Sequence, residues 1–125
     1  MTSDDYTAAR YDEMPSKWDG FVNLVRPGLG IGAFGVNVMN LPPDYATREH
    51  DETESGQEEL YVALAGSGAV VVGETRLELD PERAVRVGPS VRRALASGAD
   101  GLRVMIVGGV PGQAYEPSPW SSEGD

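Results

Sequence analysis

One histidine and two nearby glutamates are the side chains of this sequence best suited to chemistry. His50 is the only histidine in the chain, and Glu52 and Glu59 follow it. If this segment is a strand, residues i and i+2 point to the same side, so His50 and Glu52 share a face. One imidazole and two carboxylates form a donor set for a divalent metal ion. The alternative is a structural or solvent-facing His50 and a solvated acidic loop around Glu52.

Several other catalytic chemistries lack the residues that they need. The chain has no cysteine, which excludes disulfides, Cys-ligated zinc, iron–sulfur clusters and cysteine nucleophiles. Ser67, Ser90 and Ser97 have no histidine at any motif spacing, so a Ser–His–Asp triad has no support. The glycine-rich run 28–32 precedes no predicted helix, so we expect no dinucleotide-binding loop there.

The chain is acidic, with 20 Asp and Glu against 10 Lys and Arg and a formal net charge of −10. Phosphates and anionic lipids bind basic surfaces, so we expect neither a nucleic acid nor a membrane as partner. No apolar run approaches the roughly 20 residues that a membrane span needs. No basic-then-apolar segment at the start resembles a signal peptide, so we expect a cytoplasmic protein.

Short apolar stretches, separated by Gly, Pro and Asp, begin at residue 21. Several of them alternate, so that Leu77 and Leu79 face inward and Arg76 faces outward. No stretch after residue 20 shows helical periodicity over about three turns. This pattern predicts an antiparallel sandwich or barrel. The predicted strands are Phe21–Arg26, Ile31–Leu41, Leu60–Ala65, Ala69–Val72, Thr75–Leu79, Ala84–Val87, Val91–Ala96 and Leu102–Val107.

The 125 residues suit one domain, which we assign to residues 20–110. Residues 1–19 form an N-terminal arm, either with a short helix around Asp5–Tyr11 or as frayed chain. Residues 111–125 form an irregular tail that is rich in Pro, Ser and Gly. Because this tail contains two aromatic residues, Tyr115 and Trp120, we expect it to pack on the barrel or on a second subunit.

Two stretches resemble the motifs of the cupin superfamily. Residues 50–68, HDETESGQEELYVALAGSG, are similar to the first motif, a His-x-His pair and a Glu before a strand of the form YVLxG. Residues 81–97, PERAVRVGPSVRRALAS, are similar to the second, in which Pro-Gly-Asp, an apolar strand and Pro-x-Gly precede a His. The resemblance covers about residues 30–110. It implies an all-β fold, the antiparallel double-stranded β-helix or jelly-roll barrel of small single-domain cupins, and a homodimer.

The resemblance also implies a divalent metal ion held by three His and one Glu, and this set is degenerate here. His50 takes the first position, Glu52 replaces the second histidine, Glu59 takes the glutamate position and Arg93 replaces the third histidine. Arginine has no lone pair to offer. Its charge about 4 Å from a divalent ion costs about 8 kcal/mol at an effective dielectric of about 20. A complete structural zinc site is worth roughly 10–16 kcal/mol, so we expect no tight metal site.

Arg93 has other uses in such a barrel. It would pair with Glu59 or Glu52 in place of the metal charge, or present a forked donor to a carboxylate or phosphate of a ligand. Arg92 would then face the opposite way. Tyr61 is expected to line the barrel or to lie on a dimer surface.

Three functions are consistent with these features. The first is a non-enzymatic cupin that binds a small, even anionic, molecule in the barrel, through residues that would line the interior: His50, Glu59, Tyr61, Arg93 and Met105. The second is a metal-dependent enzyme, of the dioxygenase or isomerase type, with Fe, Mn, Ni or Zn on His50, Glu52 and Glu59. The third is a dimeric scaffold or interaction protein with the arm or the tail as the contact.

Overall fold

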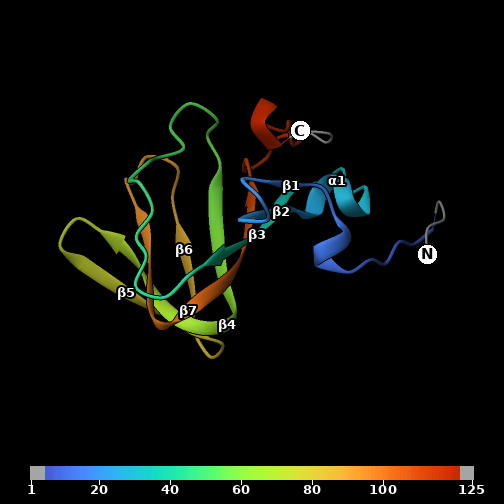
Figure 1. The fold of residues 1–125 in the computed structure, drawn as a ribbon. Coiled ribbons are helices and arrows are strands. Elements are labelled where there is room, and N and C mark those ends of the chain that lie inside the picture. The colour runs from blue at the N-terminus through green and yellow to red at the C-terminus, as the bar shows by residue number, and fades with distance from the viewer. Residues whose placement is uncertain (1–4, 122–125) are drawn as a thin grey trace.

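A computed structural model describes residues 5–121. Its antiparallel strands curl into a barrel, with an N-terminal segment packed on one side (Figure 1). The order in the sheet is β1-β2-β3-β7-β4-β5, and β6 pairs with β4. The antiparallel barrel predicted from the sequence is confirmed. The strands are β1 Ser16–Lys17, β2 Val22–Leu24, β3 Gly35–Leu41, β4 Glu58–Val72, β5 Thr75–Leu79, β6 Ala84–Val87 and β7 Ala94–Gly109, and the helices are η1 Tyr11–Glu13, α1 Val25–Leu29 and η2 Pro119–Ser121.

The two longest strands, β4 and β7, pair with each other and turn the corner of the barrel together. Their register shifts on both sides of residue 66. Gly66 has a φ of 76°, and a Cβ there would collide with the carbonyl oxygen of Gly101. Only glycine satisfies both conditions. The glycine-rich run 66–68 therefore bends β4, where the sequence predicted a break between two strands.

The predicted strand boundaries are right at both ends of β5 and β6 and at the C-terminal ends of β3 and β4, and they are wrong elsewhere. Residues 94–96 of the predicted strand Val91–Ala96 and all of Leu102–Val107 belong to β7, because this strand continues through 97–101. The predicted strand 21–26 shortens to β2, since α1 begins at Val25. This helix has 5 residues, too short to show a periodic pattern in the sequence.

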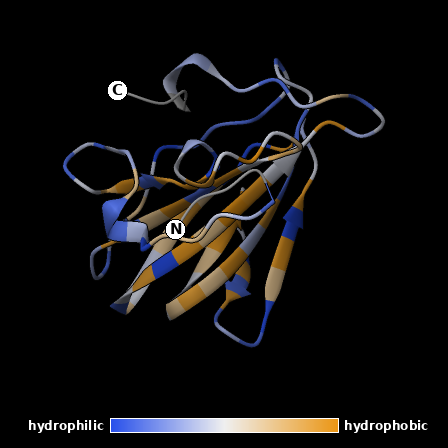
Figure 2. Ribbon diagram, turned by 90° about the vertical axis from the view of Figure 1, so that its right-hand side faces the viewer, coloured by the Kyte–Doolittle hydropathy of each residue, from blue (hydrophilic) through white to orange (hydrophobic). Residues whose placement is uncertain are grey.

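Two apolar clusters form the core, one on each face of the β3–β7–β4 sheet. Alternation along the strands separates them. Figure 2 shows how apolar segments recur along these strands. The cluster inside the barrel consists of Leu41, Tyr61, Ala63, Val70, Leu79, Val87, Leu95, Leu102 and Val104. The outer cluster consists of Met14, Val25, Val36 and Val38. The barrel interior is thus filled by its own side chains.

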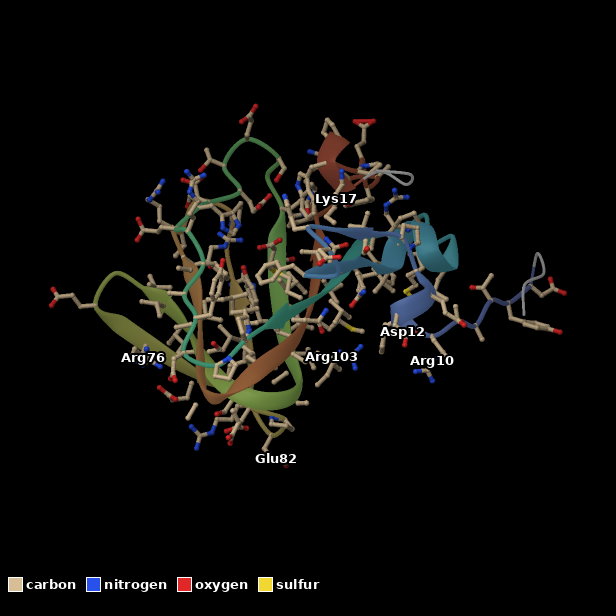
Figure 3. All side chains as sticks on the ribbon, in the orientation of Figure 1. Arg10, Asp12, Lys17, Arg76, Glu82 and Arg103 are labelled. Atoms are coloured by element: carbon tan, nitrogen blue, oxygen red, sulfur yellow. The ribbon has the colours of Figure 1, made fainter. Side chains whose placement is uncertain are left out.

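Residues 11–19 of the N-terminal arm pack beside the sheet, whereas residues 5–10 are exposed, so the predicted short helix over Asp5–Tyr11 is wrong. Residues 5–10 are not helical, and β1 extends the sheet by pairing with β2. Met14, which belongs to this arm, is buried. The Arg103 guanidinium lies 5.0 Å from the centre of the Tyr11 ring; Figure 3 shows Arg103 between the barrel and this segment. Within residues 5–121, no helix has the length and apolarity that crossing a bilayer requires.

Candidate functional site

The candidate site lies at one end of the barrel, which we call the mouth and define by His50, Glu52, Glu59 and Arg93. The loop between β3 and β4 crosses this end beside the C-terminal segment, at the top of Figure 1. His50 and Arg93 exchange backbone hydrogen bonds of 2.9 and 2.8 Å. The Glu52 N–H donates to the carbonyl of Pro89 at 2.8 Å. Backbone contacts therefore fix the loop that carries the first two site residues.

Arg93 is fully buried, and its guanidinium is held by four hydrogen bonds. Nη2 donates to Glu59 Oε1 at 2.8 Å, and Nε donates to the Tyr61 hydroxyl at 3.2 Å. Nη1 donates to the carbonyls of Gly88 and Val91. The predicted pairing with Glu59 is what these distances show. Since a guanidinium has five N–H donors, little remains to form a fork for a ligand.

The hydroxyl of Tyr61 joins the same network by donating to Glu59 Oε1 at 2.8 Å. Burial, followed by the negative charge of Glu59, raises the pKa of the Tyr61 phenol, so the proton stays on its oxygen. Burial opposes the charge of Arg93, but hydrogen bonds with Glu59 and Tyr61 outweigh it and raise the pKa of the guanidinium. The network is therefore a fixed ion pair with a neutral phenol.

Glu52 folds over the mouth instead of standing in a solvated loop. Its Oε2 lies 3.1 Å from His50 Nε2, and its Oε1 accepts from the Ser55 hydroxyl at 2.8 Å. The hydrogen bond from His50 is the largest cause of a lowered pKa at Glu52, burial opposes it, and Ser55 adds to it. The strand geometry expected for 50–52 is wrong, because residues 51 and 52 lie in a loop, yet the two side chains do meet.

His50, Glu52 and Glu59 offer ligand atoms that all lie within 4.8 Å of one another. This donor set suits a hard divalent ion. However, Glu59 Oε1 already accepts hydrogen bonds from Arg93 and Tyr61, and the Arg93 charge lies 2.8 Å from that oxygen. The described residues therefore do not fit a tight metal site.

Neighbouring charged residues point outward, as the sequence predicts. Glu58 pairs with Arg86 at 2.8 Å on the outer surface, opposite to Glu59. Arg92 pairs with Glu49 at 3.0 Å, also on the outside. Alternation along each strand therefore separates the mouth residues from their sequence neighbours.

Met105 does not lie with the other predicted site residues. It packs against the outer cluster, whereas its neighbour Ile106 packs inside the barrel next to Tyr61. Its assignment to the ligand site is wrong, because odd and even positions of β7 face opposite sides of the sheet. Tyr61 lines the barrel, which is one of its two predicted positions.

The sequence analysis missed two amides at the mouth, Asn37 and Gln57. Both line a cavity of about 50 Å³ beside Glu52 and Glu59, together with residues of the C-terminal segment. No motif marks these amides; the only signal at Gln57 is an uncharged side chain within an acidic run. Of the two partners expected for the tail, the barrel is contacted through Tyr115, Ser118 and Trp120, which line this cavity, while most other residues of 111–120 are exposed.

Solved structures share this architecture. A cupin protein from Bacteroides fragilis matches with a TM-score of 0.70 at 17% identity, over 93% of each chain. The chain has the cupin fold. A Cupin 2 conserved barrel domain protein from Salinispora arenicola matches with a TM-score of 0.65 at 14% identity, over 82% of this chain and 86% of that one. The Cupin_2 domain of an XRE family transcriptional regulator from Enterobacter cloacae matches with a TM-score of 0.61 at 19% identity, over 72% and 95%.

No family model matches the sequence, and no curated protein matches it. The similarity to solved cupin structures confirms the jelly-roll fold that the motifs implied. A shared cupin fold does not identify a ligand or a reaction, because this fold carries many functions.

Proposed function

We propose that this cupin-fold protein binds a small molecule at the barrel mouth and does so without a tightly bound metal ion. The observation that carries the proposal is the buried guanidinium of Arg93, hydrogen-bonded to Glu59 and Tyr61. Its position corresponds to the third histidine of the motif that the sequence resembles. A fixed positive charge thus compensates Glu59 where a metal cation would otherwise do so.

The exposed polar groups of the mouth support a binding role. The side chains of His50, Glu52 and Glu59 are 50%, 21% and 14% exposed, and they stand above a packed apolar interior. A ligand would therefore contact the mouth without entering the barrel. The anionic ligand considered from the sequence is not retained, because the donors of Arg93 are engaged and two carboxylates face the opening.

The test is the metal content of tag-free protein by elemental analysis, combined with thermal melts. We expect far less than one equivalent of Fe, Mn, Ni or Zn, and no change in Tm with EDTA, since a metal bound only to the folded state would raise Tm. Arg93→His serves as the matched variant, because it restores the missing ligand type and should bind added metal more tightly. Near-stoichiometric metal in the unmodified protein would contradict the proposal.

A metal-dependent enzyme of the dioxygenase or isomerase type is the second candidate. The observation that favours it is the group of ligand atoms within 4.8 Å on His50, Glu52 and Glu59. EDTA should lower the Tm and the activity of such an enzyme, so the same thermal melts distinguish the two candidates. The homodimer stays a prediction, and light scattering coupled to size-exclusion chromatography measures it.

A further inference from the structure

A small polar cavity separates the mouth from the C-terminal segment, residues 110–121. Its volume is about 50 Å³. Three parts of the chain meet there: the paired ends of β3 and β7, the start of β4 with the loop before it, and the C-terminal segment. The residues that line it are Gly35, Asn37, Glu52, Gln57, Glu59, Ile106, Gly108, Tyr115, Ser118 and Trp120.

Two amide side chains in the cavity wall have no hydrogen-bond partner among residues 5–121. Gln57 is only 7% exposed, and its one hydrogen bond runs from its backbone N–H to the Ser55 hydroxyl. Asn37 lies on the inward face of β3, and no side-chain hydrogen bond satisfies its amide. Gln57 is buried and Asn37 is half-buried, and an unpartnered amide gains hydrogen bonds when a polar ligand occupies the cavity. These two groups therefore indicate a cavity suited to a polar ligand.

The backbone makes room for this arrangement. Gly35 and Gly108 are paired across β3 and β7. A Cβ on Gly35 would collide with the Tyr115 hydroxyl, and a Cβ on Gly108 would collide with the amide oxygen of Gln57. Because Gly35 and Gly108 have no side chains, the Tyr115 ring and the Gln57 amide fit against the sheet at this level.

The charges around the cavity favour a single positive charge. Glu52 and Glu59 carry two negative charges and Arg93 carries one positive charge, which leaves −1 for these three side chains. A monovalent cation neutralises this set, whereas an anion adds to the excess and a divalent ion exceeds it. Carboxylates and amide oxygens accept hydrogen bonds, and aromatic rings attract cations.

We propose that this cavity binds the ammonium group of a small primary amine, with the C-terminal segment as one wall. The inference names the ligand class of the mouth and rests on the proposed function. About 50 Å³ accommodates a group of the size of one water molecule, roughly 30 Å³ in the liquid. A primary ammonium has this size and three N–H donors, whereas a quaternary ammonium is larger and has none.

The first experiment titrates the tag-free full chain with ethylammonium chloride and observes tryptophan emission and the His50 imidazole by NMR. The chain has two tryptophans, Trp18 and Trp120, whose ring centres lie 5.9 Å apart, so emission reports on the C-terminal segment. We expect saturable changes in both signals. At the same ionic strength, tetramethylammonium should bind at least about tenfold more weakly, and sodium acetate and ethanol should not bind.

The second experiment compares matched variants. Glu52→Gln should weaken ethylammonium binding at least about tenfold, and Gln57→Leu should weaken it several-fold. Glu54→Gln removes the same charge from an exposed position of the same loop and should change Kd less than about twofold. Trp120→Ala, at a half-exposed ring, tests the wall without altering the core.

Each result supports the inference or overturns it. If Glu52→Gln and Glu54→Gln weaken ethylammonium binding equally, the effect reflects general charge attraction and the proposed site is wrong. If acetate or ethanol shifts the His50 signal and ethylammonium does not, the ligand class is wrong while the proposed function stands. If none of these probes shifts His50, and a wider set of small molecules also fails, both are wrong.

Discussion

The two ends of the barrel contrast in how they are built. At the mouth, charged side chains meet in a cavity of about 50 Å³ beside the buried Arg93. At the opposite end, where β4 and β7 turn the corner at the bottom of Figure 1, the chain closes on itself through Gly66, Gly68 and Gly101. We call this second region the bend.

Volume does not locate the chemistry, because surface hollows of similar size lie at both ends. On the mouth side, a hollow of about 450 Å³ is lined in part by Glu58, Glu59 and Arg86. The surface hollow at the bend is about 370 Å³. Its walls are mostly proline, glycine and aliphatic residues, together with Asn40, Asp100 and Arg103. The mouth holds four ionisable side chains in mutual contact, so charge and burial distinguish it.

The largest expected effect lies at the bend. Gly66→Ala places a Cβ against the carbonyl of Gly101 at a positive φ, so we expect a loss of about 4 kcal/mol in unfolding free energy or no folded protein. Urea denaturation measures it. Gly88→Ala is the control, because its Cβ meets open space and φ is ordinary, and it should stay within about 0.5 kcal/mol. Similar losses in both variants would contradict the close approach at the bend.

At the mouth, Glu59→Gln removes the carboxylate that compensates a fully buried guanidinium. We expect a loss of about 3 kcal/mol, because an uncompensated buried charge is costly. Glu58→Gln is the matched control on the adjacent outward position, with its exposed partner Arg86, and should cost less than about 1 kcal/mol. Equal costs in urea denaturation would show that Arg93 is not held as described.

A smaller effect is expected for Tyr61→Phe. The change removes one hydroxyl that accepts from Arg93 and donates to Glu59, at an expected cost of about 1.5 kcal/mol. Tyr45→Phe removes a hydroxyl from a ring that is 42% exposed and should cost less than about 0.5 kcal/mol. Thermal melts at matched pH compare them, and a neutral Tyr61→Phe would exclude the phenol from the network.

The smallest effect is a pH dependence at Glu52. Its pKa is lowered in the folded state, so its contribution to stability is present above its ordinary pKa of 4.5 and is lost as pH falls through the lowered value. The free energy of unfolding of wild type should exceed that of Glu52→Gln by less than about 1 kcal/mol near pH 6, and the difference should shrink as pH falls below the ordinary pKa. Urea denaturation across this range, with Glu54→Gln as control, measures it; a difference independent of pH would contradict the His50–Glu52 pair.

Strand boundaries could be predicted from the sequence where apolar and polar residues alternate along the whole strand. The predicted boundaries of β5 and β6 agree with the structure, because each alternates and ends at a clear turn. The two long strands were each divided, since a glycine-rich run looks the same whether it ends a strand or bends one. Helix α1 and β1 were missed because both are too short for periodicity to show.

Within the site, short-range patterns identified Glu59, His50 and Arg93, and alternation separated Glu59 from Glu58. Met105 was wrongly assigned to the site, because only the register of β7 shows that its side chain lies on the outer face of the sheet. Asn37 and Gln57 could not be found from the sequence, because isolated amides belong to no motif.

The sequence by itself determined the antiparallel barrel, since alternation is a local property, and its resemblance to the cupin motifs drew attention to Arg93. Only the tertiary structure decided how that arginine is used. Its partners Glu59 and Tyr61 lie on β4 and Gly88 follows β6, so residues about 30 positions apart in the sequence meet only in the folded chain. The cavity under residues 110–121 likewise exists only where β3, the loop before β4 and the C-terminal segment meet, because residues far apart in sequence supply its walls.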